Sequence, residues 1–562
     1  MLKTKTEFLI GGLLGIIICL PALWPFFQPQ FFHLHDWTHV ARLVEMDQAL
    51  KDGHFPVRWS ADLGYGFGMP QFNFYAPLPY YIAELFHLLG MSFIWSIKLL
   101  VIFNFWISFI ALYWLGNRLW GKWAGLIAGT AFIYAPYRAV DTYVRGAFGE
   151  LTAITFIALS LYCLVRWVKQ PTRRWFAYTA LALGGLILSH NLVAFLALPL
   201  LWALAVSGAL VYRRQWRLAG TALLIFLLGV GVSAFYSLPA LAEKQYTQVD
   251  TLTTGFSDYH QHFLYLRQFL QNRWGYGGSI FGPNDNISFY LGLGQMILGL
   301  AGVMTVFVCR KKPKRLSNWL IVMSAGIIGF SILMSTFKMQ WLWNLIPLFK
   351  YVQFPWRYLS VIIVFLSVLS GAAFRLFPQK RKIAASAMTV AACGGLIFLN
   401  LANFKPEAYL TDNNALYYTD AGRIQREMSG IIPDFLPIQA NPKLNAPPDI
   451  RFEIIPPAQS LTIDIDRTQE FHLTAKLDQP STLIVNSFYF PGWTLYINGQ
   501  KAPIIIDPLK GAMSLNLSQT GEAAIAGQLA ETPIRVLANL ISLVSLIVVG
   551  YLLLPDKKYG RY

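Results

Sequence analysis

Apolar runs long enough to cross a membrane recur along most of this sequence. A helix needs roughly 20 apolar residues to span the hydrocarbon core of a bilayer, and within lipid a chain satisfies its backbone only as helices or as a closed barrel. The runs lie near 8–27, 92–115, 122–137, 150–168, 175–190, 192–211, 218–240, 286–308, 317–336, 355–374, 383–402 and 533–554. The sequence therefore predicts a polytopic α-helical membrane protein with about 12 spans.

The composition supports this class and excludes another. Of the 562 residues, 55% are hydrophobic and 13% are charged, whereas soluble proteins carry roughly 25% charged residues. The formal net charge of +17 could indicate a nucleic-acid partner, but the basic residues form short clusters between the apolar runs. We therefore expect the lipid bilayer as a partner and no nucleic acid. The run from Phe8 to Phe26 lacks a small-residue cleavage site, so we expect an uncleaved first span.

The basic clusters also predict the orientation. The Pro-flanked stretch Pro77–Leu89 is short, and we expect it to lie along the membrane surface or to re-enter rather than to span. With that choice, about half of the 45 Lys and Arg residues fall in short segments on one side, which the positive-inside rule makes cytoplasmic. Both termini are then cytoplasmic, and the outside regions are those at 28–91, 138–149, 241–285, 337–354 and 403–532.

Three regions follow from this topology. We expect a transmembrane module at 1–402 with interfacial helices in its outer loop at 28–91, an extracytoplasmic mainly-β domain at 403–532, and a last span with a cytoplasmic tail at 533–562. Within the β domain, a short helix is expected in Asn413–Ser429. Alternating apolar and polar residues predict strands that pair as a small β-sandwich, with Asn498-Gly499 as a hairpin turn. The predicted strands are Ser460–Asp466, Phe471–Lys476, Ser481–Ser487, Trp493–Ile497 and Lys501–Ile506.

The four cysteines lie in or beside apolar runs, at Cys19, Cys163, Cys309 and Cys393. None lies in the predicted β domain, so no disulfide framework is expected there. We expect free thiols that pack as small apolar groups.

The first outer loop holds the strongest candidate for chemistry. Apolar residues from Val40 to Leu50 recur at helical spacing and Gly53 predicts the helix end, so Asp36 stands just before a surface helix. As the helix N-cap, its carboxylate would accept backbone N–H bonds. As a general base, it would take a proton from an acceptor hydroxyl. The two roles are compatible, and both stay open.

Two other patterns in this loop have a structural interpretation beside a functional one. His33, His35 and His39 surround Asp36, and imidazole and carboxylate groups are common metal ligands. Because no second ligand cluster is evident, we expect these histidines to hydrogen-bond to substrate or lipid headgroups. The glycines of the stretch 64–68 resemble a phosphate-binding loop, but they follow no core strand and open no recognisable nucleotide-binding helix, so packing of an aromatic loop is favoured.

Polar residues elsewhere on the predicted outer side complete the candidate site. Arginines near a membrane boundary can bind phosphate oxygens or anchor the interface. Lys98 lies inside a predicted span, where a charge is costly and indicates a function unless the side chain snorkels outward. The predicted substrate- or phosphate-binding residues are His35, His39, Arg42, Arg58, Lys98, Arg138, Asp141, Arg145, Glu150, His190 and Arg357.

A series of motifs in the first 360 residues resembles a known bacterial family. The pattern HDWTHVAR…GHFPVRW…GYGFGMPQFNFYAPLPYY, followed by APYRAVDTYVRGAFGE and LSHN, resembles 6-pyruvoyl-tetrahydropterin-synthase-related membrane proteins. The architecture is similar to that of the GT-C class of integral-membrane glycosyltransferases, and SFYFPGWTLYINGQKAPI is similar to the terminal β domain of bacterial proteins assigned to that class.

The resemblance implies a function as well as a location. It implies a multi-pass protein of the bacterial cytoplasmic membrane, in which Asp36 matches the early loop carboxylate that acts as base or positions the acceptor. The short acidic metal-binding pattern of some members is not evident in this sequence, so the cofactor stays unknown and a divalent cation stays open.

The expected function is sugar transfer from a polyprenyl-phosphate donor to an extracytoplasmic glycan, lipid or protein acceptor. Asp36 would be the base, and Arg138 and Arg145, with Lys98, would hold the leaving phosphate. The alternatives are a non-enzymatic carrier or flippase for lipid-linked glycans, and a scaffold that binds cell-envelope polymer. Paired discontinuous spans in two related halves would favour a carrier, and no clear internal repeat is present.

Overall fold

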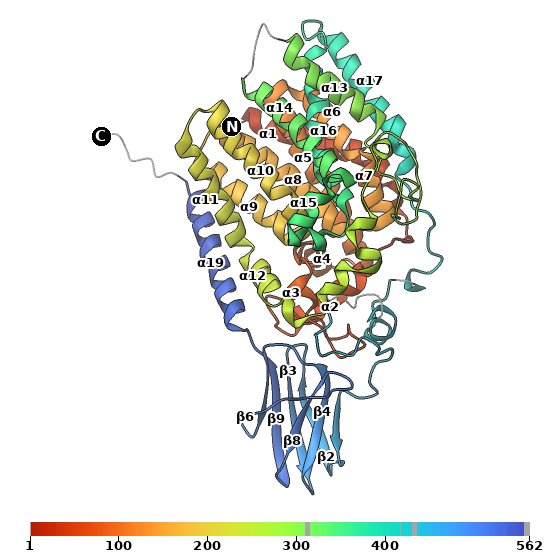
Figure 1. The fold of residues 1–562 in the computed structure, drawn as a ribbon, viewed down its shortest axis with the longest axis vertical. Coiled ribbons are helices and arrows are strands. Elements are labelled where there is room, and N and C mark those ends of the chain that lie inside the picture. Colours follow the sequence, from red (N-terminus) through yellow and green to blue (C-terminus); the bar gives the residue numbers. More distant parts are fainter. Residues whose placement is uncertain (1, 310–314, 416, 430–434, 556–562) are drawn as a thin grey trace, which may run out of the picture.

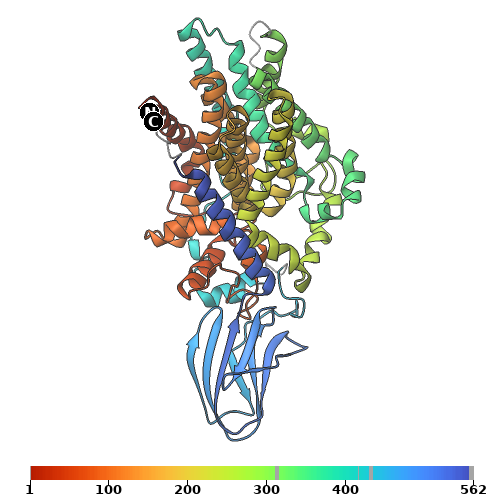
Figure 2. The ribbon, with the colours of Figure 1, turned by 90° about the vertical axis from the view of Figure 1, so that its left-hand side faces the viewer.

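A computed structural model describes residues 2–309, 315–415, 417–429 and 435–555. The helices form one elongated body, and the strands form a separate layer pair at one end of it (Figure 1). Figures 1 and 2 show that α19 runs from the strands up along the helical body and ends away from them, and that α1 also begins in the part of the body away from the strands. Residues 310–314, which belong to one of the basic clusters, and the last residues of the predicted tail, 556–562, lie outside the described residues.

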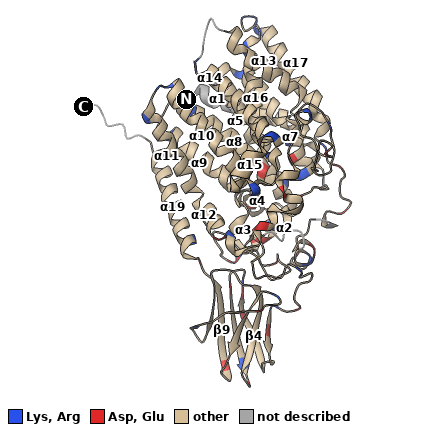
Figure 3. Ribbon diagram, viewed as in Figure 1, with Lys and Arg blue, Asp and Glu red and all other residues tan. Residues whose placement is uncertain are grey.

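The helical body consists of long helices joined by short ones. In the view of Figure 3, charged residues of both signs gather in the region of α2, α3, α4 and α15, and few lie along the long helices. The longer helices are α1 (Leu2–Leu23), α5 (Phe93–Trp120), α6 (Lys122–Ile133), α8 (Phe148–Lys169), α9 (Arg173–Ser189), α10 (Asn191–Ser207), α11 (Trp216–Val232), α13 (Leu293–Val308), α14 (Arg315–Met334), α16 (Leu359–Ala372), α17 (Lys382–Asn400) and α19 (Pro533–Leu553). The shorter ones are α2 (His39–Lys51), α3 (Gln71–Phe74), α4 (Leu78–Leu88), α7 (Pro136–Ala139), α12 (Ala234–Ala242), α15 (Gln340–Leu345) and α18 (Ala421–Arg423).

The expected count of about 12 spans is not confirmed. Among the described residues, 8 helices are long and apolar enough to cross a membrane, or 9 if α11 and α12, which meet at a bend of 78°, form one span. The other predicted spans are helical but short, since α6, α9 and α13 have 12, 17 and 16 residues. At 1.5 Å per residue, the 12 residues of α6 reach only about 18 Å, against roughly 30 Å of hydrocarbon.

The stretch Pro77–Leu89 forms α4, which has 11 residues and is too short to span. Its side chains divide into two sets. Tyr80, Ala83 and Glu84 are buried, whereas Leu85 and Leu88 are exposed. This is the pattern of a helix that lies along a surface with one side packed against the protein. It agrees with the expectation that this stretch does not span the membrane, on which the predicted orientation depends.

The carboxyl-terminal strands form two antiparallel sheets that share one core. One sheet has the order β1-β4-β8-β7 and the other β2-β3-β9-β5-β6. Phe471 and Leu473 from the second sheet and Leu483 and Val485 from the first belong to the same buried cluster. The strands are β1 (Phe452–Ile455), β2 (Ser460–Asp466), β3 (Glu470–Leu477), β4 (Ser481–Phe488), β5 (Trp493–Ile497), β6 (Gln500–Ala502), β7 (Ile505–Ile506), β8 (Ala512–Leu517) and β9 (Gly521–Leu529).

One predicted strand is divided between the two sheets. Asn498 and Gly499 have positive φ angles of 50° and 79° and form the expected hairpin turn between β5 and β6. The predicted strand at 501–506 then breaks after Ala502, and β7 pairs with β8 in the other sheet. Pro503 stands at the break, because proline lacks the N–H that a continued ladder needs.

The glycines of 64–68 pack the first outer loop against the β-sandwich. The ring of Phe67 stacks on Phe488 at 4.9 Å between centroids, and the Phe488 amide donates to the Phe67 carbonyl at 2.8 Å. Gly68 has a φ of +76°, and a Cβ there would collide with the indole of Trp59. The glycines therefore allow close packing, which is the structural interpretation of this loop.

Candidate functional site

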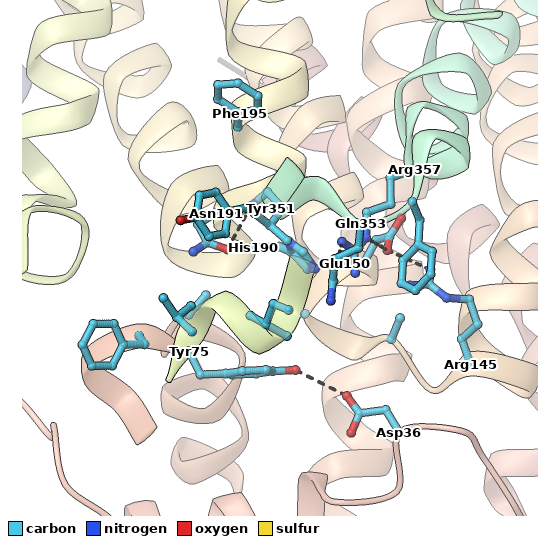
Figure 4. Close-up of a pocket in the computed structure, with 18 of the residues that line it drawn as sticks. Asp36, Tyr75, Arg145, Glu150, His190, Asn191, Phe195, Tyr351, Gln353 and Arg357 are labelled. Atoms are coloured by element: carbon cyan, nitrogen blue, oxygen red, sulfur yellow. Dashed lines mark hydrogen bonds and ion pairs between the residues drawn. The ribbon is translucent and has the colours of Figure 1, made fainter. Parts of the chain in front are cut away.

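One cavity of about 570 Å³ lies between the first outer loop and the helical body. Its walls come from parts of the chain that are far apart in sequence: the start of α2, the start of α8, the turn between α9 and α10, α12, and the stretch before α16. Figure 4 shows Asp36 and Tyr75 on one side of it, and His190, Gln353 and Arg357 on the other. Seven predicted site residues line the cavity: His35, Asp36, Arg42, Arg145, Glu150, His190 and Arg357.

Backbone pairing holds the loop that carries Asp36. The amides of His35 and Asp36 donate to the carbonyls of Val144 and Arg145 at 3.0 and 2.8 Å, in the π-helix η2 (Val140–Arg145). Gly146 follows with a φ of +65°, and a Cβ on it would lie 2.9 Å from the Asp36 carbonyl oxygen. A glycine is therefore required where the two segments cross.

The Asp36 carboxylate accepts several hydrogen bonds at the cavity wall. The Thr38 hydroxyl donates to Oδ1 at 2.8 Å, Arg42 Nη1 lies 3.2 and 3.3 Å from the two oxygens, and the Tyr75 hydroxyl donates to Oδ2 at 3.4 Å. The N-cap residue of α2 is Thr38, so of the two open interpretations of Asp36 the structure does not support the helix cap. About one-third of the Asp36 side chain stays exposed, which leaves room for a ligand.

Charge around Asp36 favours its ionised form. Burial raises the pKa of Asp36, but the charge of Arg42 and the hydrogen bonds from Thr38 and Arg42 lower it by more, so the pKa lies well below its usual value. Arg42 is held in turn, since its guanidinium lies 4.1 Å above the Tyr75 ring and Nη1 donates to the Tyr80 hydroxyl at 3.3 Å.

His39 stands behind the cavity rather than on its wall. Its Nε2 donates to the Gly146 carbonyl at 2.5 Å and lies 3.4 Å from Asp36 Oδ2, and its Nδ1 pairs with the Tyr80 hydroxyl at 2.9 Å. In the neutral ring, Nε2 carries the proton and Nδ1 accepts from Tyr80. His39 therefore positions Asp36 and is itself 2% exposed.

A second charged cluster surrounds Glu150 at the opposite wall. Arg145 Nη1 donates to Asp141 Oδ1 at 2.5 Å and to Glu150 Oε2 at 2.7 Å. The hydroxyls of Tyr137 and Ser360 donate to Glu150 Oε1 at 2.7 and 2.5 Å. Arg145 thus bridges the two carboxyl groups, and the cluster holds the wall together.

Arg357 offers donors that no described residue takes. Its Nη1 donates to the Val352 carbonyl and, at 3.1 Å, to Gln353 Oε1. Its buried Nε lies 3.8 Å from Glu150 Oε2 and makes no hydrogen bond within the described part of the chain, and the same holds for Trp356 Nε1. Gln353 has a φ of +64°, a conformation that non-glycine residues adopt at a cost and mostly at functional sites.

His190 adds a donor to the same wall. It stands at the N-cap of α10, where its Nδ1 accepts the Val193 amide at 3.3 Å. In the neutral ring the proton is then on Nε2. The helix boundary after the predicted span at 175–190 therefore fixes which nitrogen of His190 can donate.

Four other predicted residues do not line the cavity. Lys98 donates to the carbonyls of Gln28, Pro29 and Gln30 at 2.6, 3.4 and 3.1 Å. Arg138 donates to Ser108 at 3.1 Å and lies between the rings of Phe105 and Phe132. Arg58 pairs with Glu531 at 2.7 Å, and Asp141 is wholly buried behind Arg145. These four side chains therefore contact other parts of the protein instead of the cavity, because the tertiary packing around each one sets its direction.

The sequence did not single out three residues of the cavity wall, Tyr75, Lys244 and Tyr351. Lys244 Nζ lies 4.7 Å above the Tyr351 ring, and no ion pair with a described carboxylate is present. The sequence signal that could have identified Lys244 is its position shortly after the predicted span at 218–240, on the expected outer side. Among the described residues, no group of three or more His, Cys, Asp or Glu side chains could hold a metal ion.

Comparison with known proteins places the chain in a family. Residues 72–406, more than half of the chain, match the family described as "6-pyruvoyl-tetrahydropterin synthase related domain; membrane protein". The chain belongs to this family. The matched part of this 6-pyruvoyl-tetrahydropterin-synthase-related membrane protein contains Glu150, His190 and Arg357, whereas Asp36 lies before it. A curated relative from Lactococcus lactis subsp. cremoris (strain MG1363), named "Uncharacterized protein", is 26% identical over 255 residues, which cover 42% of this chain and 40% of that relative.

Several solved structures are similar to this chain at a distance. Mycobacterial arabinofuranosyltransferase AftD matches with a TM-score of 0.42 and 15% identity, over 72% of this chain and 27% of that protein. ArnT from Cupriavidus metallidurans, bound to undecaprenyl phosphate, matches with a TM-score of 0.39 and 15% identity, over 69% of this chain and 64% of that protein. The Archaeoglobus fulgidus oligosaccharyltransferase in the apo form matches with a TM-score of 0.40 and 12% identity, over 74% of this chain and 60% of that protein. At TM-scores below 0.5, these likenesses support no functional conclusion.

Proposed function

We propose that this protein is an integral-membrane glycosyltransferase that moves a sugar from a polyprenyl-phosphate donor to an extracytoplasmic glycan, lipid or protein acceptor. The observation that carries the proposal is the composition of the cavity. It combines an ionised carboxylate on one side, a buried cation with unused donors on the other, and an apolar wall that begins at membrane-length helices. A lipid-linked phosphate sugar needs each of these three features.

The donor phosphate is assigned to the wall that contains Arg357. Buried N–H groups without partners are rare in proteins, and an anionic oxygen would satisfy Arg357 Nε and its neighbour Trp356 Nε1. His190 can donate from Nε2 toward the same ligand. This assignment replaces the predicted roles of Arg138 and Lys98, which do not line the cavity, while Arg145 shapes the wall through Glu150.

The prenyl chain is assigned to the apolar side of the cavity. Leu192 and Phe195 of α10 and Ala240 and Leu241 of α12 line that side. Leu241 is 64% exposed, so the wall continues to the outside of the protein between helices of membrane length. An apolar tail can then stay in lipid while the phosphate enters the cavity.

The reaction uses Asp36 to direct the acceptor. The Asp36 carboxylate accepts a hydrogen bond from the acceptor hydroxyl, whose oxygen forms a bond to the anomeric carbon as the bond from that carbon to the phosphate oxygen breaks. The phosphate leaves with the electron pair and Asp36 takes the hydroxyl proton, so the anomeric configuration inverts. A carboxylate whose pKa lies below its usual value is a weak base, which suits a transition state in which proton transfer follows cleavage.

We also propose that the protein lies in the bacterial cytoplasmic membrane with both termini in the cytoplasm and the cavity outside. The arrangement of α1 and α19, which begin and end far from the β-sandwich, supports this orientation (Figures 1 and 2). The cavity and the β-sandwich are then on one side, where an acceptor that contacts the sandwich can also reach Asp36.

The test is sugar transfer by the purified protein in detergent, with polyprenyl-phosphate-linked sugars as donors and lipid-free envelope glycans as acceptors. Asp36→Asn and Arg357→Gln should abolish transfer, while Asp464→Asn, an exposed carboxylate on β2, should retain it. Detergent removes the two sides of a membrane, so donor binding without transfer in the wild type would favour a carrier. Full transfer by Asp36→Asn would overturn the proposal. Addition of a chelator to the same assay tests the need for a divalent cation.

A further inference from the structure

A second cavity, separate from the proposed active site, lies between three helices of the body. It measures about 470 Å³ and is lined by Arg173 and Phe176 of α9, Leu224, Leu227 and Leu228 of α11, and Ser545, Val548 and Leu552 of α19. Two of these helices belong to segments of membrane length and composition. We call this cavity the α9–α11–α19 groove.

Close contacts beside the groove explain why it exists. A Cβ on Gly231 would collide with the Ser545 hydroxyl, and the Ser542 hydroxyl donates to the Gly231 carbonyl at 3.0 Å. A Cβ on Gly229 would lie 2.9 Å from Leu183, so α9 also approaches α11 closely at this level. Small residues bring the three helices together at this level, whereas leucines of α11 and Arg173 line the groove beside it.

The groove is open on its apolar side and charged at one end. Leu224 and Leu227 are each 56% exposed, so the outer rim presents leucine side chains to whatever surrounds the helices. Arg173 stands at the first residue of α9 and its Nη2 donates to the carbonyl of Leu554, directly after α19 ends. A cation at the helix ends and leucines along the helix walls match the head and the tail of one membrane lipid.

We propose that the α9–α11–α19 groove binds one anionic glycerophospholipid, with an acyl chain between the helices and the phosphate on Arg173. The bound lipid fills the groove and so braces α19 against α9 and α11. This matters for the β-sandwich, because α19 follows its last strand directly. The site does not depend on the proposed reaction, and it lies among residues that the reaction does not use.

The test uses native mass spectrometry of the full-length protein after removal of bulk lipid, with phosphatidylglycerol as the probe. One tightly bound phosphatidylglycerol per chain is expected. Leu227→Trp should fill the groove, and Arg173→Gln should lower the affinity by at least about tenfold, as expected for loss of one charge-assisted hydrogen bond. Leu223→Trp is the matched control, because Leu223 is an exposed leucine on the same helix outside the groove.

The outcomes separate the proposal from a general effect of the substitutions. Retained binding by Leu223→Trp and reduced binding by the other two variants would support the site. Equal retention by all three variants, or equal loss from all three, would overturn it. Phosphatidylcholine serves as a second probe, and equal affinity for the two lipids would refute the assignment of an anionic headgroup. Sugar transfer is not the readout, so the result is independent of the proposed function.

Discussion

Removal of the Arg42 charge should make Asp36 easier to protonate. Arg42 Nη1 lies 3.2 and 3.3 Å from the two carboxylate oxygens. Two unit charges at about 3.3 Å attract by roughly 5 kcal/mol at an effective dielectric constant of about 20. Solvent reduces this, because one-third of Asp36 is exposed. A cation at such a distance typically lowers a carboxyl pKa by about 1–3 units, so Arg42→Gln should raise the pKa of Asp36 by about that amount.

The sign of the effect on pH dependence follows directly. Asp36 must be ionised to accept the acceptor proton, and Arg42 keeps it ionised down to low pH. In Arg42→Gln the acidic limb of the kcat/KM profile should therefore move to higher pH by about 1–3 units. Arg42→Lys keeps the charge and should shift the limb less, although a lysine cannot reproduce the planar stacking on Tyr75.

A measurement without substrate makes the reasoning falsifiable even if Arg42→Gln is inactive. Infrared difference spectra report the carbonyl stretch of a protonated carboxyl, and Asp36→Asn identifies the band that belongs to Asp36. The midpoint of this band against pH should be higher in Arg42→Gln than in the wild type. An unchanged midpoint would refute the conclusion that Arg42 controls the ionisation of Asp36, and would do so whatever the reaction is.

Three further substitutions test other contacts. Gly146→Ala places a Cβ 2.9 Å from the Asp36 carbonyl oxygen at a φ of +65°, so kcat should fall severalfold while the amount of folded protein in gel filtration changes little. Lys98→Met removes the donor for three carbonyls, so the melting temperature should fall while donor affinity per folded molecule is unchanged; a loss of affinity would restore the predicted phosphate role. Arg535→Met leaves the buried Glu243 without its cation, which lies at 2.9 Å, and with hydrogen bonds only from neutral groups. This should cost about 3–5 kcal/mol and speed proteolysis near 530, whereas adding Glu243→Gln should recover part of the loss.

Local patterns were enough to predict many elements. The strands β2 and β5 have the predicted bounds, and α2 follows the predicted apolar spacing up to its end before Gly53. These elements are decided by period and by turn residues, which neighbouring residues in the chain define. The division of the predicted strand at 501–506 was missed, because the sheet that each half joins depends on partners far away in sequence.

The candidate site was predictable in part for a similar reason. Asp36, Arg145 and Glu150 were identified from residue type and from their expected place at a membrane boundary, and they line one cavity. Lys98 and Arg138 meet the same criteria but are directed to backbone carbonyls and aromatic rings. The direction of a side chain depends on which helix packs beside it, and a single sequence does not contain that information.

The sequence by itself determined that this chain is a membrane protein with long apolar helices and a carboxyl-terminal β region, because hydropathy and periodicity act over a few turns of chain. Only the tertiary structure decided which charged groups meet. Arg42 and Asp36 are joined across one helix start, whereas Glu150 and Arg357, about 200 residues apart in the chain, lie together in the cavity wall. Burial makes each such pairing strong, and burial is a property of the packed fold rather than of any segment.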